Sequence, residues 1–173
     1  MNIKALCDDI CNENDTTIKV ILKNYSDMVY RLALSQLKNK ADAEDVFQEV
    51  FVKYIKTDKT FETDEHIKAW LIRVTVNCCR KLKKTAWFKH TVPLEEWSAE
   101  LTNEGEHEKS EVYYAVMELP PKYRTIIHLF YYEDMQVNEI SSVLNMKQST
   151  IVSQLRRARN ILRKKLKGEY DYE

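Results

Sequence analysis

Basic side chains that could contact phosphate groups gather at two separate places in this sequence. One cluster contains Arg80, Lys81, Lys83 and Lys84. The other, with no acidic residue among its members, contains Arg156, Arg157, Arg159, Arg163, Lys164, Lys165 and Lys167. Such groups bind the phosphate backbone of nucleic acids, although basic residues near the end of a helix also complement the helix dipole without any ligand. The clusters alone leave both interpretations open.

The rest of the composition argues against enzyme chemistry. The 173 residues include only two glycines, Gly105 and Gly168, whereas glycine-rich phosphate loops need two or three glycines close together. The four histidines, at positions 66, 90, 107 and 128, lack the spacing of a metal site and the neighbours of a catalytic nucleophile. We therefore expect no catalytic residue, no metal, no cofactor and no small-molecule substrate.

The four cysteines form no CxxC pair and so predict no metal or disulfide framework. The spacing of Cys7 and Cys11 leaves a redox or metal role for that pair open, whereas Cys78 and Cys79 point in different directions on a helix. The first fifteen residues carry four acidic side chains where a signal peptide would be apolar, and no apolar stretch could span a membrane. We expect a cytoplasmic protein with reduced thiols.

An acidic stretch divides the chain, although its 27 basic and 27 acidic residues balance overall. Lys109 is the only Lys or Arg among seven glutamates, which are Glu95, Glu96, Glu100, Glu104, Glu106, Glu108 and Glu111. Residues 91–110 also lack a sustained apolar period, which indicates an extended, self-repelling linker. We therefore predict two small domains, residues 1–90 and residues 111–173.

The first domain is predicted to contain three amphipathic helices. The first runs from about Ile18 to Leu37, and the second runs from Asp42, its expected N-cap, to Lys56. The expected buried stripe of the second helix comprises Val46, Phe47, Val50, Phe51, Tyr54 and Ile55. A polar loop then leads to a third helix from about His66 to Lys84. Its expected core face comprises Ile67, Leu71, Val74, Cys78 and Leu82.

The second domain is predicted to contain four helices, over residues 112–119, 121–132 and 137–144 and from residues 147–149 to about 167. Asn145 suits the left-handed conformation with which many helices end. The expected buried residues of the last helix are Ile151, Leu155, Ala158, Leu162 and Leu166. A short helix, a tight turn and a long basic helix form the helix-turn-helix plan, whose second helix enters the major groove. The predicted fold class is all-α: two small helical domains joined by an acidic flexible linker, the C-terminal one a helix-turn-helix.

Several short motifs occur in a characteristic order around the linker. The first domain carries residues 42–51 (DAEDVFQEVF), then residues 69–74 (AWLIRV) followed by Asn77. The second carries residues 119–124 (LPPKYR), 138–140 (NEI) and 149–159 (STIVSQLRRAR). Together these motifs resemble the sigma-70 family, and within it the small two-domain extracytoplasmic-function (ECF) sigma factors, over almost the whole chain.

This resemblance implies a non-enzymatic, promoter-recognition subunit of bacterial RNA polymerase. The first domain is implied to bind core RNA polymerase and to recognise and melt the −10 element, and the second to recognise the −35 element. The implied partners are core RNA polymerase, double-stranded and melted promoter DNA, and an anti-sigma factor, which in this family is often membrane-anchored. A role in transcription initiation, as part of a stress response, follows from the same resemblance.

We assign the expected contacts residue by residue. The core polymerase contacts are Asp45, Gln48, Glu49 and Lys53. The −10 contacts are Phe61, Arg73, Asn77, Arg80, Lys81 and Lys84. The −35 contacts are Gln148, Ser149, Val152, Ser153, Gln154, Arg156, Arg157, Arg159 and Arg163. Phe61 is expected to line a pocket for an extruded base, with simple packing beneath the loop as the alternative.

Four residues depart from the family pattern. Asn145 and Lys147 stand where family members commonly have Gly and Ser, which weakens the turn and the helix cap. Val152 and Gln154 stand where Lys and Arg are usual, which bears on the −35 sequence that is recognised.

A stand-alone helix-turn-helix transcription regulator is the alternative function. It explains the second domain equally well. It does not explain a second basic helix with Arg73, Asn77 and Arg80, or the acid-and-amide face beside Asp45.

Overall fold

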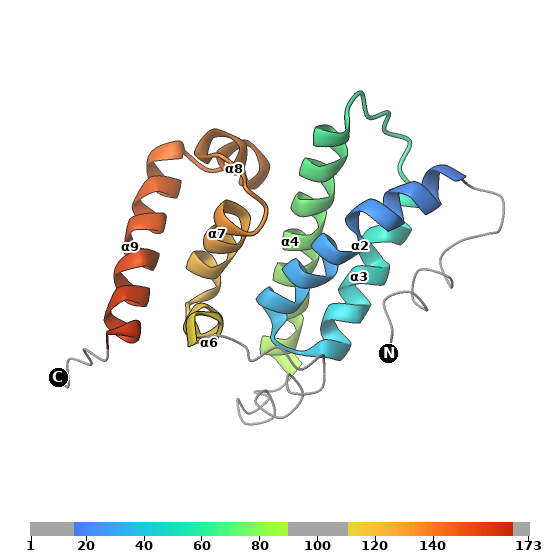
Figure 1. Cartoon of the computed structure of the whole chain (residues 1–173). Coiled ribbons are helices and arrows are strands. Elements are labelled where there is room, and N and C mark those ends of the chain that lie inside the picture. The colour runs from blue at the N-terminus through green and yellow to red at the C-terminus, as the bar shows by residue number, and fades with distance from the viewer. Residues whose placement is uncertain (1–15, 90–110, 168–173) are drawn as a thin grey trace. The chain divides into compact units, whose positions relative to one another are not determined.

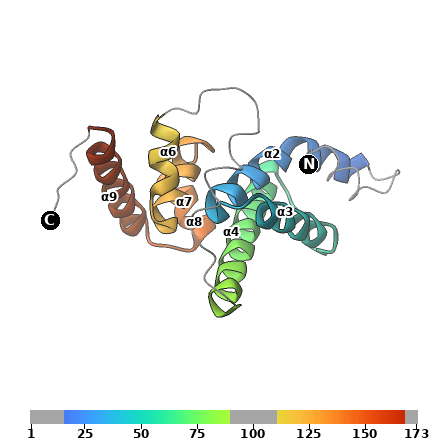
Figure 2. The same ribbon diagram turned by 90° about the horizontal axis from the view of Figure 1, so that it is seen from below.

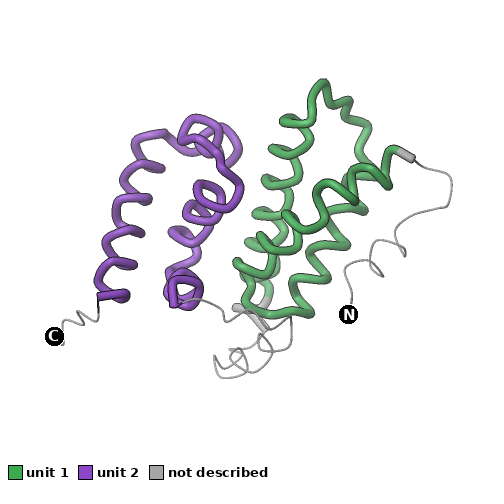
Figure 3. Tube along the Cα trace, viewed as in Figure 1, with its two compact units in different colours: residues 1–94 green, residues 95–173 purple. Residues whose placement is uncertain are grey.

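The computed structural model describes residues 16–89 and 111–167, and every regular element within these ranges is an α-helix (Figure 1). The chain divides into two compact units, residues 1–94 and residues 95–173 (Figure 3). The predicted linker at 91–110 lies outside the described residues, as do Cys7 and Cys11. Among the described helices, none is long and apolar enough to cross a membrane.

The first unit is built from α2 (Thr16–Leu37), α3 (Lys40–Ile55) and α4 (Asp64–Lys89), each of which packs against the other two (Figure 2). Its core forms where the three apolar faces meet, because each helix has a stripe of large side chains on one side. The largest fully buried side chains are Leu32, Phe47, Phe51, Leu71 and Ile72. A three-helix core of this kind leaves the opposite side of each helix available for binding.

Helix α3 begins earlier than its sequence predicts. Asn39, and not Asp42, is the N-cap: its Oδ1 accepts a hydrogen bond of 2.8 Å from the backbone N–H of Asp42. Asn39 has the extended backbone of an N-cap and follows Lys38, whose positive φ reverses the chain direction after α2. Asp42 therefore lies inside the first turn, where burial and the neighbouring Asp45 raise the pKa of its carboxyl group.

The buried face of α4 is also rotated relative to the prediction. Its most buried positions include Leu71, Ile72, Thr75, Val76 and Cys79, because α4 contacts both α2 and α3 and not one neighbour alone. Of the predicted core face, Leu71 and Cys78 are buried, whereas Ile67, Val74 and Leu82 are only half-buried. In α3, Tyr54 is half-buried and Ile55 is exposed, because the helix ends there.

The second unit is built from α6 (Glu111–Glu118), α7 (Pro121–Tyr131), α8 (Val137–Leu144) and α9 (Gln148–Leu166). The long α9 packs against the other three helices. Asn145 takes the left-handed conformation at the end of α8, with φ 52° and ψ 51°, as predicted. Leu166 was expected to be buried but is 37% exposed, because it is the last residue of α9. The three shorter helices pack against one side of α9, and its other side is exposed along its length.

A buried arginine joins α6 to α7. Arg124 is only 2% exposed, and its Nη1 donates a hydrogen bond to the backbone carbonyl of Met117 near the end of α6. Burial lowers the pKa of the Arg124 guanidinium to about 10, because a charged group loses hydration inside the protein. Its role is therefore structural: it satisfies a helix-terminal carbonyl where α6 gives way to Pro120 and Pro121.

Candidate functional site

The polar side of α3 forms a continuous surface opposite its buried stripe. Asp45 and Gln48 are exposed, and Glu49 and Lys53 continue the same side one and two turns later. The Nζ of Lys53 donates a hydrogen bond of 2.7 Å to Oε1 of Glu49. This bond lowers the pKa of the Glu49 carboxyl and raises the pKa of the Lys53 amine, since each charge stabilises the other. The structure thus brings all four predicted polymerase contacts onto one helix face.

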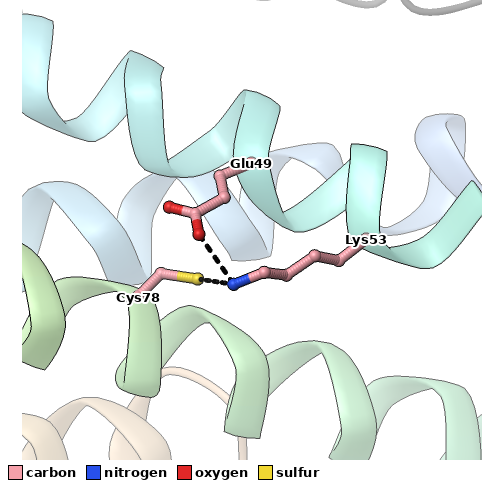
Figure 4. Close-up of polar contacts among 3 residues, drawn as sticks. All are labelled: Glu49, Lys53 and Cys78. Atoms are coloured by element: carbon pink, nitrogen blue, oxygen red, sulfur yellow. Dashed lines mark hydrogen bonds and ion pairs between the residues drawn. The ribbon is translucent and has the colours of Figure 1, made fainter. Parts of the chain in front are cut away.

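Lys53 also reaches across to α4. Its Nζ lies 3.2 Å from Sγ of Cys78, so that one ammonium group is shared by a carboxylate and a thiol from two helices (Figure 4). Burial raises the pKa of the Cys78 thiol, and the hydrogen bond from Lys53 only partly offsets this effect. Sequence reasoning placed Cys78 in the core and missed this contact, which depends on how α3 packs against α4.

The basic stripe of α4 is exposed along the length that was predicted. Arg73, Asn77, Arg80 and Lys84 follow one another at helical spacing, and all four are exposed. Lys81 is exposed beside them and helps to lower the pKa of Glu49, which places it on the side that faces α3. The candidate polymerase face and the candidate DNA stripe are therefore neighbours on the first unit.

Phe61 belongs to a cluster of three aromatic rings. It stacks on Tyr54 with ring centres 5.8 Å apart and meets Trp70 edge-on at 5.7 Å. Tyr54 and Trp70 are themselves 5.9 Å apart, and all three residues are half-buried. The sequence identified Phe61 alone. Tyr54 and Trp70 could have been predicted as well, because each is an aromatic residue on one of the two helices that flank the loop.

The exposed face of α9 is formed by its first three turns. Gln148, Ser149 and Arg156 are exposed there, and Val152 is 54% exposed although it is apolar. Ser153 is half-buried, and its hydroxyl donates a hydrogen bond of 2.9 Å to the carbonyl of Thr150. A single exposed apolar side chain is common on protein surfaces, so Val152 does not by itself mark a binding site, and the candidate face is defined by the exposed polar side chains around it.

Gln154 does not share this face. It is half-buried, and its Oε1 is buried with no hydrogen-bond partner within the described residues. Helix geometry places it on the opposite side of α9 from Val152. Gln154 and Ser153 are the two of the nine predicted contacts on α9 that are half-buried and not exposed.

Two of the predicted phosphate contacts, Arg157 and Arg159, lie near tyrosines of α7. The Nε of Arg159 donates a hydrogen bond of 2.9 Å to the hydroxyl of Tyr131, which lies at the end of α7. Arg157 lies near Tyr123, at the start of α7, and is among the groups that lower the pKa of its hydroxyl. Burial would raise the pKa of Tyr123, but Arg157 and the neighbouring Lys122 lower it overall. Arg163 is exposed. Arg157 and Arg159 therefore flank the exposed face of α9 from opposite sides.

No group of three or more His, Cys, Asp or Glu that could hold a metal ion occurs in the part of the chain that the structure describes. The described cysteines, Cys78 and Cys79, are both buried thiols. Each of the three candidate surfaces is instead made of polar, basic and aromatic side chains, which suit binding.

Comparison with known proteins gives matches to both units. The family model for sigma-70 region 2 matches residues 21–88, and the model for sigma-70 region 4 matches residues 109–162. RNA polymerase sigma factor SigV of Bacillus subtilis (strain 168) is 31% identical over 147 residues, which covers 81% of this chain and 85% of SigV. ECF RNA polymerase sigma factor SigM of the same organism is 30% identical over 153 residues, which covers 85% of this chain and 93% of SigM.

Two solved structures show the same fold. The sigma factor RpoE, in a complex with the anti-sigma factor NepR from Bartonella quintana, matches with a TM-score of 0.69 at 21% identity, over 88% of this chain and 98% of RpoE. CnrH, in a complex with the cytosolic domain of CnrY, matches with a TM-score of 0.67 at 22% identity, over 96% of this chain and 98% of CnrH. The two-unit helical architecture is therefore shared with both.

Proposed function

The chain belongs to the sigma-70 family, in its ECF group, and from this premise we propose which of its surfaces serves each step of promoter-specific initiation. A protein of this group binds core RNA polymerase, directs it to promoters through the −10 and −35 elements and initiates transcription without being an enzyme. A stand-alone helix-turn-helix regulator is not favoured, because the region 2 match accounts for the helices of the first unit.

We assign core polymerase binding to the polar side of α3. The observation that carries this assignment is the run of Asp45, Gln48, Glu49 and Lys53 along one side of a helix whose other side is fully occupied by the core. The Glu49–Lys53 hydrogen bond fixes two of the four side chains before a partner arrives. Polar anchors that are already ordered lose little side-chain entropy on binding.

The −10 element is assigned to the neighbouring basic stripe of α4 and the aromatic cluster. Melting exposes a negatively charged single strand and unstacked bases, which need cationic side chains and aromatic faces. The cationic side chains are Arg73, Arg80, Lys81 and Lys84, and Asn77 adds a neutral amide among them. Phe61 is already stacked on Tyr54 and packed against Trp70, so it offers an aromatic face only through the part of its ring that remains exposed. Holding Phe61 in place pre-forms one wall of a base-binding pocket.

The −35 element is assigned to the exposed face of α9. Ser149, Val152 and Arg156 project from the helix that follows the turn, which is the recognition helix of this motif. A guanidinium can bind a guanine with two hydrogen bonds, and the exposed Val152 side chain can contact a thymine methyl group. Arg157, Arg159 and Arg163 surround this face and are assigned to phosphates, while half-buried Gln154 is retained only as a peripheral contact.

These assignments define the proposed domains and location. Residues 1–90 serve polymerase binding and the −10 element, residues 91–110 serve as the linker, and residues 111–173 serve the −35 element. Because its partners are RNA polymerase and promoter DNA, we place the protein in the cytoplasm. An anti-sigma factor is a further proposed partner, since the solved relatives RpoE and CnrH are each in complex with NepR or CnrY.

Reconstitution with purified core RNA polymerase tests the proposed function. We expect the chain to form a stoichiometric complex with core enzyme and to support run-off transcription from a restricted set of promoters. Binding of the chain alone to specific DNA, without any effect on core RNA polymerase, would instead support the stand-alone regulator.

A further inference from the structure

Two reactive side chains from different helices of the first unit are in direct contact. The Nζ of Lys53 lies 3.2 Å from Sγ of Cys78, and the same nitrogen lies 2.7 Å from Oε1 of Glu49 (Figure 4). The packing of α3 against α4 creates this contact, because Lys53 and Cys78 are 25 residues apart in the sequence. Lys53 remains partly exposed to solvent, so small molecules in water can reach the nitrogen side of the pair.

The resting state of this group follows from its surroundings. Burial raises the pKa of the Cys78 thiol, and Glu49 raises the pKa of the Lys53 amine, so the neutral thiol accepts a hydrogen bond from an ammonium group. The carboxylate of Glu49 is in hydrogen-bond contact with that ammonium and can accept its proton. The nitrogen of Lys53, which is a nucleophile once it has lost a proton, thus contacts both a thiol and a proton acceptor.

We propose that Lys53 and Cys78 form an oxygen-dependent covalent bridge, Nζ–O–Sγ, which crosslinks α3 to α4. The ammonium of Lys53 first gives its extra proton to Glu49 or to water. One dioxygen molecule is then consumed: its O–O bond breaks, one oxygen atom bonds to both Nζ and Sγ, and the other leaves as water with one hydrogen from each group. The nitrogen and the sulfur each lose two electrons, and dioxygen gains four.

The geometry favours this product over two others. A bridging oxygen requires nitrogen and sulfur to move only somewhat closer than their present 3.2 Å, whereas a direct N–S bond would require a much closer approach. Further oxidation of the sulfur alone, to a sulfinic or sulfonic acid, would place new charged oxygens in a buried position, since Cys78 is only 2% exposed. The bridge adds one uncharged atom where the two groups already touch.

The bridge would change the polymerase-binding face, a consequence that rests on the proposed function. Forming it removes the positive charge of Lys53 and leaves Glu49 without its ion-pair partner on the polar side of α3. It also fixes the spacing of α3 and α4 by a covalent bond. We expect the oxidised chain to bind core RNA polymerase more weakly than the reduced chain.

Mass spectrometry of the full chain tests the bridge itself. A Cys7→Ser, Cys11→Ser background removes the two thiols outside the described residues. In air-saturated buffer we expect this chain to gain about 14 Da, one oxygen less two hydrogens, and to yield a peptide linked through Lys53 and Cys78; dithiothreitol should reverse both changes. Cys78→Ser should abolish them, whereas the matched change at the next position, Cys79→Ser, should not.

Two results would overturn the inference. One is an unchanged mass after prolonged exposure to oxygen. The other is a mass gain that persists in Cys78→Ser or that maps to Cys78 without a link to Lys53.

Affinity for core RNA polymerase tests the consequence separately. We expect the bridged chain to bind about tenfold more weakly than the reduced chain, and the Cys78→Ser chain to bind equally in both conditions. If the bridge forms without any change in affinity, the crosslink is supported but the proposed docking role of Lys53 is wrong. If the bridge does not form, the proposed crosslink is wrong and the docking assignment is unaffected.

Discussion

The Nε of Arg159 donates a hydrogen bond of 2.9 Å to the hydroxyl of Tyr131, and this bond joins the recognition helix to the end of α7. The guanidinium also lies 5.4 Å from the ring centre of Phe130 and 5.6 Å from that of Tyr131. Its two terminal nitrogens still carry N–H groups that can bind a phosphate. Because the side chain is already ordered, Arg159 loses less entropy on binding DNA than an unsupported arginine would.

We therefore expect Tyr131→Phe to weaken the binding of holoenzyme to promoter DNA by about 1 kcal/mol, to the same extent for all −35 sequences. The variant keeps both aromatic rings and removes only the hydroxyl that holds Arg159. Fluorescence anisotropy on a panel of promoters measures the effect. Tyr132→Phe is the matched control, since Tyr132 is equally exposed but stacks on His128. A changed base preference in Tyr131→Phe would contradict a role in phosphate contact.

The polymerase-binding assignment predicts that Asp45→Ala combined with Gln48→Ala weakens core binding by more than about 1–2 kcal/mol. Both side chains are exposed, so helix content and the unfolding transition of the first unit should not change. Competition with the unmodified chain for limiting core RNA polymerase measures the loss. Asp27→Ala provides a control, because it removes an equally exposed carboxylate on α2, where it pairs with Arg31. Equal core affinity of the double variant and the unmodified chain would remove α3 from the interface.

The Glu49–Lys53 pair predicts a small stability effect with a definite pH dependence. Its hydrogen bond lowers the pKa of Glu49 from the usual 4.5, so it stabilises the fold above that pH and loses this effect as the pH falls through the lowered value. Because both side chains are substantially exposed, Glu49→Gln should lower the free energy of unfolding by less than about 1 kcal/mol at pH 7. Urea unfolding of both chains should show the difference shrink as the pH is lowered from 7 into the acid range where Glu49 becomes protonated. A difference that grows toward acid pH would mean that the pair does not act through the ionised carboxylate.

The sequence predicts those features that depend on local pattern. Helical periodicity places all seven described helices, and a tolerance for the left-handed conformation identifies Asn145 as the end of α8. The error at the start of α3 has a simple cause: Asn39 and Asp42 are both good N-cap residues, and only the chain reversal at Lys38 selects between them.

Contacts between helices could not be predicted in the same way. Nothing in the local sequence distinguishes Arg124, which is buried against the carbonyl of Met117, from the exposed arginines of α9. The Arg159–Tyr131 and Lys53–Cys78 contacts join residues 28 and 25 positions apart, so they depend on how two helices cross. The candidate surfaces were therefore predictable as helix faces, whereas the partners that hold their side chains were not.

Promoter melting should depend on the exposed stripe of α4. We expect Asn77→Ala and Arg80→Ala to reduce permanganate reactivity of the −10 element in complexes with core RNA polymerase, while core binding stays near normal. The reason is that these side chains are proposed to contact the separated strand, whereas the proposed docking face lies on α3. Lys23→Ala on α2 is a control for loss of an exposed positive charge. A template that is already unpaired at −10 should restore transcription, and failure of this rescue would exclude a melting role.

The last prediction separates base recognition from phosphate binding on α9. Arg156 lies at the centre of the exposed face beside Val152, where a guanidinium can form two hydrogen bonds with one guanine, worth about 1–3 kcal/mol of discrimination. Arg163 is as exposed but lies two turns further from the start of the helix, where the groove gives way to the DNA backbone. We expect Arg156→Ala to relax the preference at one or two −35 positions. Arg163→Ala should weaken all promoters alike and lower the salt dependence of binding by about one unit. Selection from a promoter library, followed by binding at several salt concentrations, distinguishes the two. If Arg156→Ala kept the sequence preference of the unmodified chain and only weakened binding, Arg156 would be a backbone contact like Arg163.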